Sequence, residues 1–158
     1  MSEEAKTVFE RSDGIQQTRV DSEGRLKLTA SFVADLKDRG EETVFVSTVD
    51  LITARIYTKA SLAKAKHFFN ESREPAAGRV FFTLMDFGQN AAIDKQGRVL
   101  LKQELRAVLK LESQQLVWLF PKKGYIEVLP EEVYKSRKAV SQQSLQADLA
   151  YLESAGLD

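Results

Sequence analysis

Cysteine is absent from this chain of 158 residues, and histidine occurs once, as His67. Without cysteine there is no disulfide, no thiolate metal site and no cysteine nucleophile. A lone histidine does not make a zinc site, which requires several His, Cys or carboxylate ligands. No Ser-His-Asp arrangement, phosphate-binding glycine loop or catalytic carboxylate pair stands out. We therefore expect no enzyme, no metal, no cofactor and no small-molecule substrate.

Long apolar runs and an excess of charge of either sign are also missing. No stretch reaches the roughly 18 apolar residues of a membrane-spanning helix, and no signal-peptide pattern is present. We therefore expect a soluble, cytoplasmic protein with no membrane partner. Lys and Arg together number 23, and so do Asp and Glu. Any binding of nucleic acid must then come from a local basic patch rather than from overall charge.

What the sequence does contain is one pentapeptide pattern, written twice. Asp21-Ser-Glu-Gly-Arg25 is matched 73 residues later by Asp94-Lys-Gln-Gly-Arg98. Each copy follows a β-branched residue and precedes apolar residues at alternate positions, a short amphipathic segment and a β-favouring stretch. A whole supersecondary unit is therefore repeated, which predicts two equivalent structural halves.

The physical content of the pattern is a tight turn followed by a strand. Asp at the first turn position accepts hydrogen bonds from backbone N–H groups ahead of it, the role expected of Asp21 and Asp94. Glycine three residues later supplies the left-handed conformation that closes a type I turn with a bulge, the role expected of Gly24 and Gly97. One such turn usually carries only a local Asp–Arg ion pair. Two such turns at matching positions of the repeat predict a shared surface that carries both arginines.

The strand that leaves each turn alternates inward and outward side chains. The expected inward positions are apolar: Leu26, Leu28, Val99 and Leu101. The expected outward positions are basic: Arg25, Lys27, Arg98 and Lys102. Together with Lys95 inside the second turn, these basic residues form a candidate basic surface. An arginine on a rigid turn can donate twice to guanine or contact a phosphate.

Four segments are expected: a disordered or extended N-terminus (1–13), a first repeat (14–74), a second repeat (75–138) and a C-terminal helix or tail (139–158). Pro75-Ala-Ala-Gly78 is expected to break the pattern between the repeats. The stretch from Gly14 to Val20 is expected to form a hairpin with Leu26–Leu28. Leu145, Leu149 and Leu152 lie at helical spacing, which predicts docking of the last helix on a neighbouring subunit.

Further elements follow from caps and periodicity. Thr29 is expected to cap a helix ending near Asp38, and Thr58 or Ser61 to cap a second. Strands are expected at 44–49, 54–57, 116–120 and 125–129, with helices over about 103–110 and after Pro130. For 79–87, the period does not distinguish helix from strand. Trp118 is expected in the core, and Phe68, Phe69, Phe81 and Phe82 as core or subunit contacts.

The doubled Asp-x-x-Gly-Arg turn, each within a strand–turn–strand–helix–strand unit, resembles the MraZ family of the AbrB-like (SpoVT-AbrB, swapped-hairpin) superfamily over roughly residues 14–138. The resemblance implies an α+β fold in which two tandem pseudo-symmetric hairpin-and-helix units form an AbrB-like, double-psi-like β core with short helices. It also implies a nucleoid-associated transcriptional regulator. Its principal DNA contacts would be Arg25 and Arg98, supported by Lys27, Lys95 and Lys102. Such regulators bind short direct repeats of double-stranded DNA as ring-like homo-oligomers, upstream of the division and cell-wall gene cluster that includes their own operon.

A second interpretation stays open. The chain can instead be an oligomeric protein-binding scaffold that keeps the fold and has lost affinity for DNA. The balanced charge favours this alternative, and so does Phe82, which stands where the family carries an arginine between the repeats.

Overall fold

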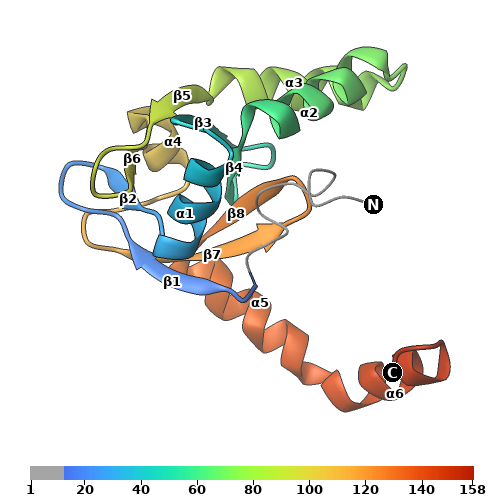
Figure 1. Cartoon of the computed structure of the whole chain (residues 1–158). Coiled ribbons are helices and arrows are strands. Elements are labelled where there is room, and N and C mark those ends of the chain that lie inside the picture. The colour runs from blue at the N-terminus through green and yellow to red at the C-terminus, as the bar shows by residue number, and fades with distance from the viewer. Residues whose placement is uncertain (1–12) are drawn as a thin grey trace.

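The computed structural model describes residues 13–158, so nearly all of the expected N-terminal extension lies outside the described residues. The fold is α+β, as predicted (Figure 1). The strands are β1 (Gln16–Arg19), β2 (Arg25–Lys27), β3 (Thr43–Ser47), β4 (Ala54–Tyr57), β5 (Gln89–Ala92), β6 (Arg98–Leu100), β7 (Leu116–Lys122) and β8 (Tyr125–Pro130). The helices are α1 (Ala30–Asp38), α2 (Lys59–Glu71), α3 (Pro75–Asp86), α4 (Gln103–Val108), α5 (Glu131–Gln143) and α6 (Leu145–Ser154).

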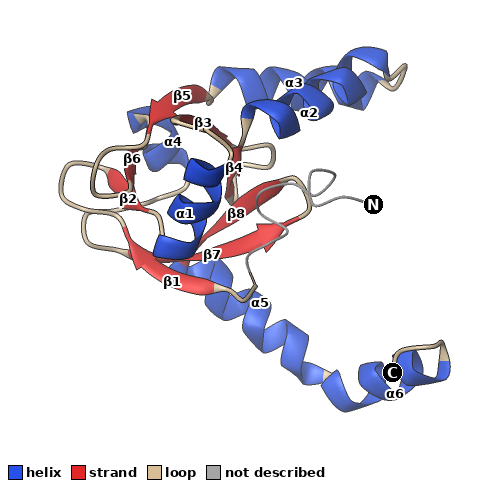
Figure 2. Ribbon diagram, viewed as in Figure 1, coloured by secondary structure: helices blue, strands red, loops and turns tan. Residues whose placement is uncertain are grey.

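The two repeats interlock through their strands. The main sheet is antiparallel, with six strands in the order β1-β7-β8-β4-β3-β5, and β2 pairs with β6 in a separate two-stranded ladder (Figure 2). Strand β1 of the first repeat thus borders β7 of the second, while β5 of the second borders β3 of the first. The strand order is symmetric about the β4–β8 pair, which agrees with the swapped-hairpin fold implied by the resemblance.

The predicted hairpin between 14–20 and Leu26–Leu28 is wrong. One isolated β-bridge, Val20 to Leu26, and a hydrogen bond from the Thr18 hydroxyl to the Lys27 carbonyl join these segments, but β1 pairs as a strand with β7. A local hairpin would leave the edge of β7 that now receives β1 without a partner, and an unpaired edge leaves backbone N–H and C=O groups unsatisfied.

The main core lies between one face of the large sheet and a cover made of β2, β6, α1 and α4. Leu26 and Val99 face each other across the small ladder and are completely buried. Phe32 of α1 and Leu105 of α4 occupy equivalent places in the two repeats, and both are also fully buried. The inward alternation predicted for the two post-turn strands is confirmed.

Residues 75–86 form helix α3, which corrects the expected break at Pro75-Ala-Ala-Gly78. Pro75 lies in the first turn of this helix, where its missing N–H group costs no hydrogen bond. Helices α2 and α3 form a projecting hairpin (Figure 1), closed by Phe69 and Phe81 with ring centroids 5.7 Å apart. Phe45, Tyr57 and Leu84 form a small second core beneath it.

Capping of the helices agrees only partly with the predictions. Thr58 and Ser61 form a reciprocal capping box at the start of α2, so both predicted residues contribute. Thr29 occupies the cap position of α1, but its hydroxyl makes no capping hydrogen bond.

Helix α5 is attached to the outer face of the sheet by an aromatic stack and an ion pair. Trp118 is only half buried, contrary to the prediction of a core position, because its strand directs it away from the main core. Its ring lies parallel to that of Tyr134, with centroids 4.1 Å apart. Arg137 Nη1 donates to Glu127 Oε1 at 2.7 Å, and Thr53 donates to the other oxygen of this buried carboxylate.

Arg137→Met is expected to lower the free energy of unfolding by about 1–3 kcal/mol at neutral pH, because it leaves a buried carboxylate short of a donor. Burial raises the pKa of Glu127, but the hydrogen bonds from Arg137 and Thr53 outweigh burial and lower it from 4.5. Stability from a lowered pKa is present above pH 4.5 and is lost as pH falls through the folded-state value. Urea unfolding should therefore show a smaller difference in the free energy of unfolding between the parent and Arg137→Met at pH 3 than at pH 7.

Lys135→Met, which breaks only an exposed pair with Glu131, is the control. An unchanged difference at pH 3 would assign the effect to packing alone.

Candidate nucleic-acid interface

The first repeated turn is held by its aspartate. Oδ1 of Asp21 accepts hydrogen bonds from the backbone N–H groups of Glu23 and Arg25, each at 2.9 Å. The Asp21 N–H donates to the Arg25 carbonyl at 2.9 Å, which closes the loop. Gly24 has a φ of 83°, in the left-handed region that favours glycine. The turn chemistry expected from the sequence is therefore present.

The second turn repeats this geometry almost atom for atom. Oδ1 of Asp94 accepts from the N–H groups of Gln96 at 2.9 Å and Arg98 at 2.8 Å. Its own N–H donates to the Arg98 carbonyl at 2.9 Å, and Gly97 has a φ of 77°. Two independent stretches of chain thus present an arginine from the same rigid frame.

The small ladder brings both turns into one surface. Strands β2 and β6 are antiparallel, with Arg25 opposite Leu100 and Lys27 opposite Arg98. Opposite residues point to the same side of a ladder, so these four side chains share the outward face. We name this face, formed by Arg25, Lys27, Arg98 and Leu100, the ladder face. It lies on the side of the molecule away from both helical projections (Figure 1).

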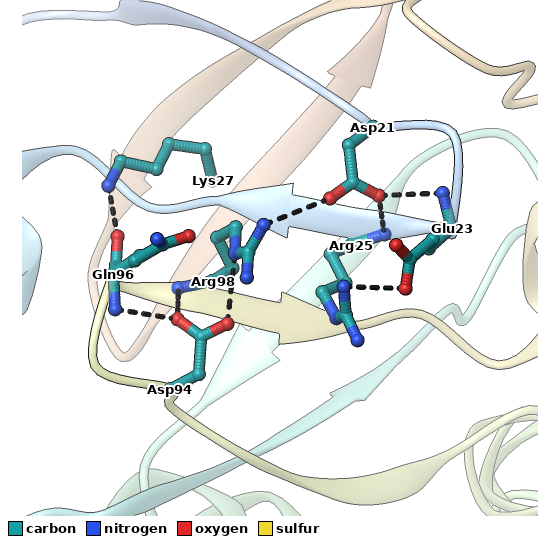
Figure 3. Close-up of polar contacts among 7 residues, drawn as sticks. All are labelled: Asp21, Glu23, Arg25, Lys27, Asp94, Gln96 and Arg98. Atoms are coloured by element: carbon teal, nitrogen blue, oxygen red, sulfur yellow. Dashed lines mark hydrogen bonds and ion pairs between the residues drawn. The ribbon is translucent and has the colours of Figure 1, made fainter.

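The two arginines have different partners, as Figure 3 shows. Arg98 Nε donates to Asp94 Oδ2 at 2.9 Å, and its Nη1 lies 3.4 Å from Oδ2 of Asp21. It therefore joins both turns. Arg25 is paired at 2.7 Å with Glu23, an exposed residue. Arg98 is therefore the more constrained arginine. The carboxylate of Glu23 partly offsets the positive charge of Arg25.

Both aspartates have a pKa below the ordinary value for this side chain. The backbone hydrogen bond from Arg25 is the main cause that lowers the pKa of Asp21, and it outweighs desolvation. For Asp94 the backbone hydrogen bond from Arg98 has the same effect, and the Arg98 side chain adds to it. The carboxylates thus hold the turns in their charged form over the whole physiological range.

The predicted lysines divide between two places. Lys95 of the second turn and Lys27 line one hollow of about 400 Å³ together with Lys37 of α1, and Lys27 Nζ also donates to the Gln96 carbonyl. Lys102 is separate from the ladder face, because its Nζ donates to the Asp86 carbonyl at the end of α3, at 3.0 Å. The structure therefore groups Arg25, Lys27, Lys95 and Arg98 more closely than Lys102.

Sequence reasoning missed how each helix covers the opposite turn. A Cβ atom added to Gly24 would lie 2.5 Å from Cζ of Arg106, and one added to Gly97 would lie 2.9 Å from Cγ2 of Val33. Val33 and Arg106 are themselves 73 residues apart, the spacing of the repeat. Extending the repeat alignment into the helices would have paired these positions. Lys37 follows Val33 by one helical turn and would have been found with it.

Two interlocked strand–turn–strand–helix units, each with an Asp-fixed turn, are consistent with an AbrB-like fold. No family model matches the chain. It is 29% identical over 142 residues to a protein of Acidobacterium capsulatum named Transcriptional regulator MraZ, covering 89% of this chain and 96% of that one. It is also 28% identical over 110 residues to a protein of the same name from Koribacter versatilis, covering 68% of this chain and 75% of that one. The chain is thus similar over most of its length to proteins named as MraZ transcriptional regulators, the family that its doubled turn resembles.

The expectation that the chain is not an enzyme agrees with these names, which describe regulation of transcription rather than a reaction. Over residues 13–158, the structure contains no helix long and apolar enough to cross a membrane. Within the same range, no group of three or more His, Asp or Glu side chains is arranged to hold a metal ion.

Proposed function

We propose that the protein is a sequence-specific DNA-binding regulator that contacts double-stranded DNA through the ladder face. The observation that carries the proposal is the pair of equivalent turns, each of which presents an arginine beside the other's strand. Arg25 and Arg98 are the principal contacts, and Lys27, Lys95 and Lys102 support them. Asp21, Gly24, Asp94 and Gly97 shape the turns and do not contact DNA themselves.

Electrostatics explains why this binding requires an assembly. One protomer offers only a few cations, and the chain as a whole has no net charge. Each neutralised phosphate contributes only about 0.9 to the slope of log K against log salt. Several protomers on adjacent sites raise affinity through effective concentration. Binding to short direct repeats as a ring-like homo-oligomer meets this requirement.

The expected targets follow from the family. The DNA would be short direct repeats upstream of a division and cell-wall gene cluster that includes the protein's own operon. The protein would then work in the cytoplasm, in association with the nucleoid. No cofactor is expected, because the ladder face supplies its positive charge from side chains.

A second candidate function is an oligomeric protein-binding scaffold without DNA affinity. The observation in its favour is Phe82, whose side chain is 71% exposed on α3 and is therefore available to a protein partner. The pairing of Arg25 with Glu23 and of Arg98 with two aspartates also favours it, because these arginines already have anionic partners.

A gel-shift titration of the full chain separates the two functions. The probe is the DNA upstream of the protein's own gene, and the control is a scrambled sequence of equal length. If six or more phosphates are neutralised, affinity for the native probe should fall by about 10³-fold or more between 50 and 200 mM salt. Preference for the native probe together with this salt dependence would support the regulator. Equal or absent binding to both probes would contradict it and favour the scaffold.

A further inference from the structure

Helix α6 projects from the body with an apolar stripe that nothing in the described chain covers. Leu145, Leu149 and Leu152 follow helical spacing, and their side chains are 56%, 47% and 50% exposed. Tyr151, on the same helix, is 71% exposed. A run of large apolar side chains this exposed typically marks a contact surface in soluble proteins.

The charge around this stripe is entirely negative. Residues 139–158 contain no lysine or arginine, and their charged side chains are Asp148, Glu153 and Asp158. Asp148 and Glu153 are adjacent in sequence to Leu149 and Leu152, so carboxylates flank the stripe. The surface that covers it should therefore be apolar and basic.

The α2–α3 hairpin of the same chain has both properties. Phe68, Phe82 and Met85 are 66%, 71% and 41% exposed, although the neighbouring Phe69 and Phe81 close the hairpin internally. Residues 59–86 carry five Lys and Arg against three Asp and Glu. Arg79 precedes Phe82 by three residues on α3, so a cation and an exposed ring share one side of the helix.

The two surfaces cannot meet within one copy, because the hairpin and the α5–α6 arm project from opposite ends of the molecule (Figure 1). They occupy corresponding places in the two repeats: α2 and α3 follow β4, and α5 and α6 follow β8. The first pair is closed by its own aromatic contact, while the second is open and leaves α6 uncovered. An uncovered acidic helix and a basic aromatic hairpin on one chain are complementary between copies.

We propose that α6 of one copy docks on the α2–α3 hairpin of a second copy, with Leu149 and Leu152 against Phe82 and with Asp148 and Glu153 facing Arg79 and Lys64. The contact is head-to-tail, since each copy uses two different surfaces. Repetition of such a contact closes into a ring or extends into a filament. The ladder face lies away from both surfaces, so assembly leaves it free (Figure 1). This interface extends the assembly part of the proposed function.

The test uses two full-length variants, Leu149→Asp and Phe82→Asp, and measures mass by size-exclusion chromatography with light scattering in the absence of DNA. The parent should be larger than a dimer, and each variant alone should be a monomer. An equimolar mixture should form a one-to-one dimer and nothing larger. The Phe82→Asp variant keeps an intact α6, and the Leu149→Asp variant keeps an intact hairpin. A mixed pair can therefore form a single contact and no more. The Arg79→Glu variant, which reverses one charge of the hairpin, should likewise form an assembly of lower mass than the parent.

Ile15→Asp changes a side chain of similar exposure outside both surfaces and should keep the parent mass. Circular dichroism of every variant shows whether it remains folded. A monomeric parent, unchanged masses, or a mixture that stays monomeric would overturn the proposal. If Leu149→Asp alone disrupts the assembly, α6 docks on another α6 or elsewhere, and the proposal also fails. Because the readout contains no DNA, failure here leaves the gel-shift result standing, and the reverse also holds.

Discussion

Leu26→Ala is expected to lower the free energy of unfolding by about 2–5 kcal/mol, the range for a buried leucine whose removal leaves a cavity. Leu26 is completely buried and lies opposite the equally buried Val99 at the centre of the small ladder. This is where the two repeats meet, so the cavity would weaken both at once. Urea unfolding followed by tryptophan fluorescence measures the change, with Trp118 as the single reporter.

The matched control is Leu100→Ala in the same ladder. Leu100 has the same side chain in a paired strand, but it points outward and is 49% exposed. Its replacement should change stability by less than about 1 kcal/mol. Equal losses for the two variants would show that the ladder is held mainly by its backbone pairing and that its inward face is not the core of the fold.

Those parts of the fold that depend on neighbouring residues could be predicted from the sequence. Asp21 and Gly24 determine a turn through bonds that span four residues, and the alternation of Arg25, Leu26 and Lys27 follows from strand geometry alone. The capping box of Thr58 and Ser61 is equally local. Each of these features is encoded within a few positions, so the physical chemistry of a short segment is enough to predict it.

Strand pairing could not be predicted in the same way. Whether β1 pairs with β2 or β7 depends on the relative free energy of two complete sheets, and both pairings satisfy the local sequence. The correct exchange follows from the symmetry of the whole structure, in which β1 and β5 take equivalent edges. The period over 79–87 left helix and strand open for a related reason. The helix there is stabilised by the contact of Phe69 with Phe81, from two separate helices.

The candidate site shows the same division. The repeat predicted two arginines in equivalent positions, and the ladder does bring them together. The sequence repeat could not predict that Arg98 would join both aspartates while Arg25 pairs with Glu23, because that difference depends on side chains across the ladder. Equivalent positions in a repeat therefore differ in their electrostatic surroundings, and the two arginines should differ when each is replaced.

Arg25→Ala and Arg98→Ala should both weaken binding to the native probe, but only Arg98→Ala should also destabilise the fold. A bidentate contact to a base contributes about 1–3 kcal/mol, or roughly 5- to 150-fold per protomer, and an assembly multiplies this loss. The Arg25 side chain forms its ion pair with the exposed Glu23, so its removal should leave the unfolding midpoint near that of the parent. Arg98 joins the two turns, so its removal should lower the midpoint.

Gel shift and urea unfolding of both variants measure the two effects, and Lys138→Ala on α5 removes one positive charge outside the ladder face as the control. Loss of binding by Arg25→Ala at unchanged stability is the informative result, because it separates DNA contact from structural support. Arg98→Ala alone cannot make that separation, since a loosened turn would weaken binding indirectly. If both arginine variants bind like the parent, the ladder face is not the DNA contact. Normal binding by Arg25→Ala alone would place the contact at the second turn, where Lys95 and Lys27 line the same hollow as Lys37.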